Sequence, residues 1–496
     1  MKMGDIVRGA AWMVLFRMAD RSLGVISTLI LARLLVPADF GLVAMANSVI
    51  AVIELVTAFS FEIALIQKAE PERKHYDTAW TLNLLLGSAC ALSVALLAYP
   101  TAWFYGEPRL PPVMLILAAA SLVGNFENVG TVDFRRKMDF RREFKFLALK
   151  RIAGFAVTVI AAFLLRSYWA LLAGVVTGRI AGVVLSYAMQ AYRPRLALSA
   201  FRELIVFSRW VLFNNSILVA IVRVPHFVIG RLHGPQALGV YLMGSELGEL
   251  TVSELAAPVT RAALPGYSRL TDNRESLKAT FLDIGSIVLL FALPAAVGIS
   301  VISDPLVRVL LGEKWLDVVP VLRLLAIAGV LIAAVSNSGS ACVALGMPAM
   351  AAWFSAVRLV VLIVAVAALA PQRGTVGVAW AELLASAACL AASNLIAFRL
   401  LKLSWNEYVS RNWRLVVASL AMWWAVRILI DWTGPSSNAA RAIRQLLLGV
   451  PAGAAVYVLV LLALWHLSGR PRGAESQVLS RTSTYARRLR DSLRIR

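Results

Sequence analysis

Apolar stretches long enough to cross a bilayer follow one another along almost the whole chain of 496 residues. Hydrophobic residues make up 60% of the sequence and charged residues 16%, a balance too apolar for a soluble globular domain. A bilayer core about 30 Å thick requires roughly 20 apolar residues per helix. We therefore predict an all-α polytopic membrane protein with about 14 spans, at residues 9–33, 40–66, 79–104, 111–133, 147–166, 169–192, 206–231, 238–265, 279–303, 318–340, 349–370, 375–398, 413–430 and 444–467.

The basic residues are distributed unevenly over the loops between these spans. A formal net charge of +21 would suggest nucleic acid as the partner of a soluble protein. Here most cations lie in alternate loops, including the run 135–151 and the arginine-rich tail after Ser468. Cations retained on the cytoplasmic side set membrane topology. We expect a multi-pass membrane protein with both termini on the cytoplasmic side, no nucleic-acid partner, and membrane lipids as partners of its basic segments.

One short motif occurs twice. "ARLLVPADFGLVAMA" at 32–46 is nearly repeated as "GRLHGPQALGVYLMG" at 230–244. The identical residues Arg33, Leu34, Pro37, Gly41 and Met45 recur at Arg231, Leu232, Pro235, Gly239 and Met243, always 198 positions later. Gly106 and Glu107 likewise match Gly312 and Glu313, and Pro112 matches Pro320.

Six spans separate the two copies, so both have the same orientation and form parallel repeats. We predict an N-lobe at 1–204 (spans 1–6), a C-lobe at 205–404 (spans 7–12), two appended spans at 405–467 and a basic cytoplasmic tail at 468–496. Two such lobes facing each other would create a central cleft, which is the architecture of alternating access. Cys90, Cys342 and Cys389 are expected to be core residues, because an odd, dispersed set gives neither a disulfide framework nor a metal motif.

Charged side chains inside the spans are the candidate functional groups. An arginine exposed to lipid at the bilayer centre costs about 2.5–3.5 kcal/mol, so these residues must face water, a partner or a ligand. Eight arginines lie within spans: Arg17, Arg21, Arg179, Arg223, Arg261, Arg323, Arg358 and Arg427. As a set they favour an anionic substrate, since arginine offers several donors to phosphate; internal ion pairs are the alternative for any one of them.

Carboxylates inside the spans are candidates for ion coupling, by taking up protons or binding sodium: Asp20, Glu54, Glu62, Glu246, Glu249 and Glu254. The four histidines form no metal-site spacing, and no phosphate-binding glycine loop occurs. We therefore expect no metal, no cofactor, no catalytic residues and no enzymatic activity.

Five stretches together resemble the polysaccharide-exporter branch of the multidrug, oligosaccharidyl-lipid and polysaccharide flippase superfamily. They are "ARLLVPADFGLVAMA" (32–46), "FRRKMDFRREFKFLAL" (134–149), "APVTRAALPGYSRLTDNRESLKATF" (257–281), "LGEKWLDVVPVLRLLA" (311–326) and "ALGMPAM" (344–350). The resemblance covers nearly the whole chain. It implies two six-helix lobes forming a V around a cationic cavity, and translocation of an undecaprenyl-diphosphate-linked oligosaccharide from the inner to the outer leaflet.

The product of such a transporter would be a lipopolysaccharide, surface polysaccharide or exopolysaccharide, and polysaccharide polymerase or export machinery would be further partners. By analogy with the basic cavities of the family, the diphosphate is expected at Arg17, Arg21 and Arg223, with Arg261 and Arg358 as further substrate-binding candidates. Related flippases couple transport to an ion gradient or the membrane potential. The sodium-site aspartate of some relatives is not carried over, because span 7 has Asn214 and Asn215 and no aspartate.

Two other classes of function remain open. An ion-coupled drug exporter of the sister branch should have a cavity dominated by carboxylates, against which the excess of arginine within the spans argues. A polytopic glycan polymerase or ligase would be expected to expose a sizeable outer loop with catalytic acids or histidine, but the outer segments here are short.

Overall fold

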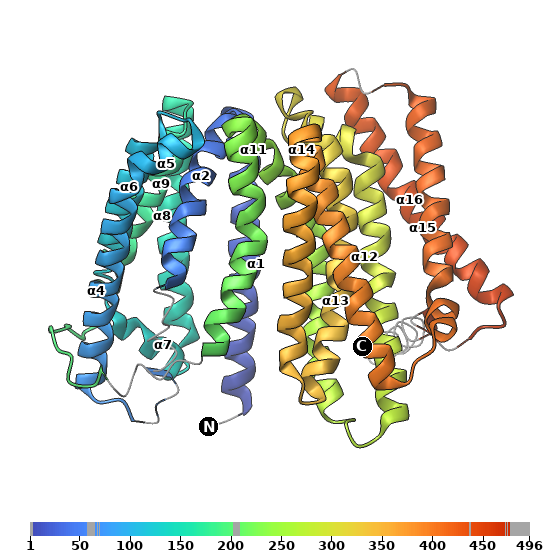
Figure 1. Cartoon of the computed structure of the whole chain (residues 1–496), viewed down its shortest axis with the longest axis horizontal. Helices are drawn as coiled ribbons and strands as arrows, with labels where there is room; N and C mark the ends of the chain where they lie inside the picture. The colour runs from blue at the N-terminus through green and yellow to red at the C-terminus, as the bar shows by residue number, and fades with distance from the viewer. Residues whose placement is uncertain are drawn as a thin grey trace, which may run out of the picture. The chain divides into compact units, whose positions relative to one another are not determined.

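The computed structural model describes residues 3–56, 65, 66, 68, 70–201, 209–435, 438–471, 473, 475 and 476. Every regular element within these ranges is a helix (Figure 1). The first half contains α1 (Met3–Leu34), α2 (Pro37–Val56), α4 (Arg73–Leu96), α5 (Ala98–Tyr105), α6 (Leu110–Gly124), η1 (Val129–Thr131), α7 (Val132–Arg136), α8 (Phe140–Leu165) and α9 (Trp169–Met189). Then follow α11 (Arg209–Ser268), α12 (Arg274–Leu310), η2 (Glu313–Trp315), α13 (Val318–Ala344), α14 (Pro348–Leu401), α15 (Trp405–Thr433) and α16 (Ala439–Leu467).

Ten of these helices are long and apolar enough to cross a membrane, or eleven if the bent pair of α6 with η1 and α7 is one span. Two of them, α11 and α14, each cover two of the predicted spans. Both contain one residue with non-helical dihedrals, Gly234 (φ 76°) in α11 and Gly374 (φ 58°) in α14. Positive φ is readily adopted by glycine, so each glycine marks the predicted hairpin between two spans. The all-helical membrane class is confirmed, and the number of 14 spans stays a prediction.

Local sequence signals account for several helix starts. Pro37 begins α2, and a proline at the first helical position lacks only an N–H that has no partner within the helix. In α15, the Ser404 hydroxyl accepts from the Glu407 amide while the Glu407 carboxylate accepts from the Ser404 amide, which forms a capping box. The side chain of Asn438 similarly accepts from the backbone N–H of Arg441 at the start of α16.

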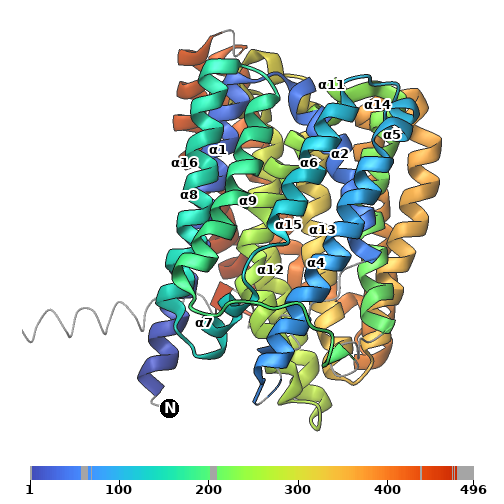
Figure 2. The ribbon, with the colours of Figure 1, turned by 90° about the vertical axis from the view of Figure 1, so that its left-hand side faces the viewer.

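The chain forms two compact units, residues Met1–Gly239 and Val240–Arg496. In unit 1, α8 packs against α1 and α9, and α6 packs against α9 and α4. Figure 2 shows α4, α6, α9 and α8 following one another across this unit. One buried cluster joins α1 to α8 and α9, and includes Leu31, Leu35 and Ala162. The aromatic residues Phe134 and Phe146 of the basic stretch after α6 are buried and pack edge to face.

In unit 2, α12 packs against α13, α15 and α16, and α13 packs against α14. Large buried side chains include Trp315, Tyr267 and Phe281. The predicted core position of the cysteines is confirmed, because Cys90 of unit 1 and Cys342 and Cys389 of unit 2 are all buried. The two units are defined by contacts between residues and divide the chain once, after Gly239. They do not test the predicted lobe boundaries after residues 204 and 404, which stay predictions.

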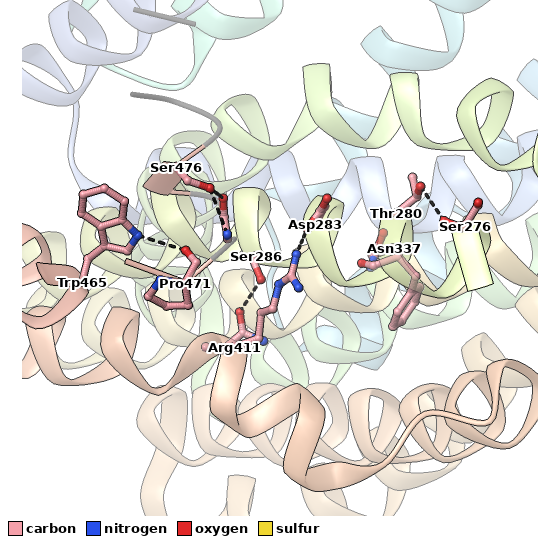
Figure 3. A network of polar contacts seen from close by, with 12 residues as sticks. Ser276, Thr280, Asp283, Ser286, Asn337, Arg411, Trp465, Pro471 and Ser476 are labelled. Atoms are coloured by element: carbon pink, nitrogen blue, oxygen red, sulfur yellow. Dashed lines mark hydrogen bonds and ion pairs between the residues drawn. The ribbon is translucent and has the colours of Figure 1, made fainter. Parts of the chain in front are cut away.

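A polar network ties α15 to α12 and to the residues after α16 (Figure 3). The Arg411 side chain lies in an ion pair with Asp283 of α12. One turn further along, Ser286 donates to Asn412 at 2.9 Å. The Arg414 Nε donates at 3.0 Å to Glu475, and both side chains are almost completely buried, at 4% and 3% exposure. The indole of Trp465 donates to the carbonyl of Pro471, also drawn in Figure 3.

This network anchors Pro471 and Glu475, at the start of the predicted basic tail 468–496. Most of the tail, residues 477–496, lies outside the described residues.

Candidate functional site

The two copies of the repeated motif pack directly on each other. A Cβ atom on Gly41 would lie 1.8 Å from the carbonyl oxygen of Pro235, and a Cβ on Gly239 would lie 1.8 Å from the carbonyl oxygen of Pro37. Gly41 and Gly239 occupy the same motif position, as do Pro37 and Pro235. The contact is therefore reciprocal, as in an interface with a local two-fold axis. The duplicated motif encodes one self-complementary crossing of α2 with α11, in which only glycine fits.

Charged side chains of three helices and of the segment after α6 form a second feature of unit 1, which we call the charge band: Asp20 and Arg21 of α1, Glu127 after α6, Lys150 and Arg151 of α8, and Arg179 of α9. Arg151 pairs with Asp20 at 3.2 Å, and both side chains are about half exposed. Lys150 donates to Glu127 at 2.6 Å. Arg21 and Arg179 are exposed on the surface of the unit.

The predicted first span would place part of this band at membrane depth, although α1 is not among the ten helices that are long and apolar enough to cross a membrane. Arg21 lies 12 residues before Arg33, which is in the last turn of α1. At 1.5 Å per residue the separation along the helix is about 18 Å, more than half of a bilayer core. An exposed guanidinium there is strongly unfavourable in lipid. The exposed face of α1 at Arg21 is therefore suited to water or to an anion.

A second polar group, the Arg223 cluster, consists of Ser48 of α2, Tyr105 of α5, and Arg223 and His226 of α11. The Nδ1 atom of His226 lies 3.2 Å from the Ser48 hydroxyl and 3.4 Å from a terminal nitrogen of Arg223. His226 and Tyr105 are buried, whereas Arg223 is partly exposed. The buried Tyr105 hydroxyl has no hydrogen-bond partner among the described residues. Its ring stacks parallel to Phe227, at 6.2 Å between centroids.

The cations of unit 2 within the spans are arranged differently. Arg358 donates at 3.0 Å to Glu382, and the two side chains are only 18% and 10% exposed. This ion pair joins the two parts of α14 on either side of Gly374. Arg323 donates to the Ser303 hydroxyl at 2.8 Å. Arg261 and Glu246 are exposed.

Part of the predicted site lies outside the described residues. This is the case for Glu62 and for the side chains of Arg17, Glu249 and Glu254. Among the rest, Asp20 and Arg21 lie together in the charge band, and Arg223 lies in its own cluster. Glu54 is exposed on α2, the helix that carries Ser48. The roles of all predicted substrate-binding and ion-coupling residues stay predictions.

Sequence reasoning missed several members of both groups. His226 follows Arg223 by three positions, which places the two side chains on one helix face, and that spacing could have found it. Ser48 and Tyr105 carry no comparable signal. Lys150 and Arg151 were grouped with the cytoplasmic basic run, whereas the structure places them ten and eleven residues into α8, where they pair with Glu127 and Asp20.

A chain of long apolar helices with a duplicated, self-packing motif defines a polytopic, all-helical membrane fold. The solved structure of the lipid II flippase MurJ in an inward closed conformation aligns with a TM-score of 0.71, covering 91% of this chain and 99% of that chain, at 13% identity. An inward-facing multidrug resistance MATE family transporter of the MOP superfamily aligns with a TM-score of 0.52, covering 78% and 96%, at 15% identity. These likenesses show the fold.

The family is shown by the sequence. A family model described as polysaccharide biosynthesis protein matches residues 30–320, more than half of the chain. The chain belongs to that family.

Among its relatives, the lipopolysaccharide biosynthesis protein WzxC of Escherichia coli (strain K12) is 24% identical over 412 residues, 82% of this chain and 84% of that protein. The succinoglycan biosynthesis transport protein ExoT of Rhizobium meliloti (strain 1021) is 24% identical over 462 residues, 92% of each chain. The teichuronic acid biosynthesis protein TuaB of Bacillus subtilis (strain 168) is 22% identical over 463 residues, 92% of this chain and 95% of that protein.

Proposed function

We propose that this chain is a flippase that carries an undecaprenyl-diphosphate-linked oligosaccharide from the inner to the outer leaflet of the bacterial cytoplasmic membrane. Three lines support the proposal: membership of the polysaccharide biosynthesis protein family, a relative named as a biosynthesis transport protein, and the likeness in fold to a lipid II flippase. The exposure of Arg21 on α1, the predicted first span, is the structural observation that carries it, because a surface of this kind suits a polar, anionic load.

The chemistry of the substrate fits the exposed polar face of unit 1. A diphosphate offers oxygen acceptors that arginine can bind with two parallel donors. We assign the diphosphate to Arg21, Arg223 and the neighbouring Arg17. Arg261 is a further candidate on its exposed face of α11. We assign Arg358 a structural role, because its ion pair with Glu382 is largely buried.

The orientation in the membrane is part of the proposal. The concentration of basic residues in alternate loops supports a cytoplasmic position for both termini. Transport by alternating access, driven by a proton or sodium gradient or by the membrane potential, would use carboxylates of the charge band and of α2, namely Asp20 and Glu54. The loaded glycan lipid would then serve a polysaccharide polymerase or export machinery on the outer side.

Reconstitution tests the proposal. Purified full-length protein is placed in liposomes with a fluorescent undecaprenyl-diphosphate oligosaccharide, and the lipid that becomes accessible to a membrane-impermeant glycosidase is followed over time under an ion gradient. We expect the wild-type protein to speed the exchange, and Arg21→Gln to slow it about tenfold or more, the loss expected when hydrogen bonds to a charged group are removed. Arg427→Gln is the matched control, because Arg427 is exposed and pairs locally with Asp431.

The outcomes discriminate between classes of function. Exchange no faster than in protein-free vesicles would reject the flippase. Export of a small organic cation by the same vesicles, without lipid exchange, would instead support a drug exporter of the sister branch. Longer glycans among the products would support a polymerase.

A further inference from the structure

The residues after α16 place a carboxylate beside two arginines of α15. The Nε atom of Arg414 donates to Glu475 at 3.0 Å, and both side chains are almost completely buried. Glu475 and Arg414 both act electrostatically on Arg411, which lies one turn earlier in the same helix. Arg411 itself pairs with Asp283 of α12 (Figure 3). Two cations and two anions therefore meet at this place, and their charges balance.

One of the two arginines has a donor that is still available. The buried Nε atom of Arg411 has no hydrogen-bond partner among the described residues, although Nη2 of the same side chain reaches Asp283. A buried donor without an acceptor is costly, so it marks a position that a ligand oxygen could fill. The Arg411 side chain is 24% exposed, so the site is not sealed. Together with Arg414 it offers two guanidinium groups to an anion.

The segment that supplies the carboxylate is attached to the helices at two points. Among the described residues, its polar contacts with the helices are those of Pro471 and Glu475. The Ser476 hydroxyl accepts from the Gly473 amide and donates to the Gly473 carbonyl, which closes a turn within the segment itself. Gly473 lies against the carboxylate, because a Cβ atom on it would be 2.6 Å from the second oxygen of Glu475. A competing anion would have to displace only this carboxylate and its turn.

The position of the two arginines along α15 indicates which anion could compete. α15 has 29 residues, so at 1.5 Å per residue it is about 44 Å long, whereas a bilayer core is about 30 Å thick. Arg411 lies about 9 Å along the helix from Trp405, its first residue. Trp405 and Trp413 are 52% and 38% exposed, and tryptophan is enriched at the membrane–water interface. We therefore expect the site at the depth of the lipid phosphates.

We propose that Arg411 and Arg414 form a headgroup site for one anionic phospholipid, and that Glu475 occupies this site as an internal competitor. The phosphate diester of phosphatidylglycerol carries one negative charge, as Glu475 does, so exchange of one for the other leaves no buried charge uncompensated. The tail after α16 is predicted to be cytoplasmic, and basic pockets between helices on that side bind anionic headgroups. The inference goes beyond the proposed function and does not depend on it, because it uses no residue assigned to the transported lipid.

Native mass spectrometry tests the site. Full-length protein in a neutral detergent is titrated with phosphatidylglycerol, and the bound lipids are counted. Glu475→Gln removes the competitor and leaves a net positive charge, so we expect one phosphatidylglycerol to bind about tenfold more tightly than to the wild type. Arg414→Gln added to Glu475→Gln should abolish this gain, and the neutral pair avoids a buried lone charge. Equal affinity of Glu475→Gln and the wild type overturns the proposal.

Two further variants separate competition from a change of net charge. Glu275→Gln removes the same charge from an exposed position in the first turn of α12 and should bind lipid as the wild type does. Gly473→Ala keeps every charge, but its methyl group would displace the Glu475 carboxylate, so it should also raise the affinity. A gain in Glu275→Gln equal to that in Glu475→Gln, or no gain in Gly473→Ala, overturns the proposal.

The source of the phosphate and the displacement of the segment are tested directly. Zwitterionic phosphatidylcholine and inorganic phosphate, at the same concentration, should not displace bound phosphatidylglycerol. Displacement by inorganic phosphate would indicate a site for free anions and overturn the lipid assignment. In the wild type, hydrogen exchange of the peptide that contains Gly473 should become faster when phosphatidylglycerol is added, because release of the segment opens the bond from the Gly473 amide to Ser476. Unchanged exchange at saturating lipid overturns the competition.

Discussion

The two copies of the repeat agree where they build the scaffold and differ where they carry polar chemistry. Gly41 and Gly239 pack reciprocally at the helix crossing, and Gly106 and Gly312 both adopt positive φ before the helix that follows. Arg223 and His226, by contrast, fall at the offset of 198 on Val25 and Thr28. Departures from the repeat, rather than the repeat itself, therefore mark the candidate site.

A corresponding pair of cations shows the same division. α8 begins at Phe140 and α14 at Pro348, a separation of 208, which is the offset between Pro112 and Pro320. By this offset, Lys150 of the first copy corresponds to Arg358 of the second copy. Each lies in an ion pair, yet Lys150 and Glu127 are more than a quarter exposed, whereas Arg358 and Glu382 are largely buried. In the second copy the ion pair of Arg358 holds the two parts of α14 together. In the first copy the ion pair of Lys150 is more exposed to solvent.

Removing these two cations should sharpen the comparison most. Arg358→Met leaves the Glu382 carboxylate buried without its partner, and we expect a loss of about 3–5 kcal/mol in the free energy of unfolding. Lys150→Met should lose about 1 kcal/mol, because water can still solvate Glu127. Unfolding in detergent micelles, followed by tryptophan fluorescence, measures both. Arg358→Met with Glu382→Leu should recover most of the loss. Equal losses in the two single variants would mean that the two positions do not differ in burial energy.

Substitution of either glycine at the crossing of α2 with α11 should destabilise the protein to a similar extent. Gly41→Ala and Gly239→Ala each force a methyl group against a backbone carbonyl, and overpacking of this kind destabilises by about 1–3 kcal/mol. Because the contact is reciprocal, the two variants should lower the unfolding midpoint by similar amounts. The double variant should lose less than their sum, since either methyl already separates the helices. Gly339→Ala is the control, because its Cβ would meet nothing within 4 Å. If Gly41→Ala lowered the unfolding midpoint and Gly239→Ala did not, the result would contradict the reciprocal crossing.

The helical architecture could be predicted from the sequence because long apolar runs leave a membrane chain few options. The hairpins at Gly234 and Gly374 also fall between predicted spans. The helical period cannot identify the partner of each charged residue. It shows which side of a helix the residue occupies, but not which other helix packs against that side. Asp20 pairs with Arg151 of α8, 131 positions away, because α1 packs on α8. The same limit hid the contact between Ser48 and His226.

The smallest expected difference concerns two glutamates that the repeat places in corresponding turns. Glu107 accepts from Nε and Nη2 of Arg109, at 2.8 and 2.9 Å, and these hydrogen bonds lower the pKa of the Glu107 carboxyl. Its counterpart Glu313 is 75% exposed and lies 3.6 Å from Arg308. We expect Glu107→Gln to lose about 1 kcal/mol of stability at neutral pH, and Glu313→Gln less than about 0.5 kcal/mol.

The pH dependence of the Glu107 contribution has a definite sign. A carboxyl whose pKa is lowered by folding stabilises the protein above the ordinary glutamate pKa of about 4.3, and this stabilisation is lost as pH falls through the lowered value. The difference between wild type and Glu107→Gln in unfolding midpoint should therefore shrink toward acidic pH. A gap for Glu107→Gln that stays constant from neutral to acidic pH would show that the Arg109 contact does not depend on the charge of the carboxylate.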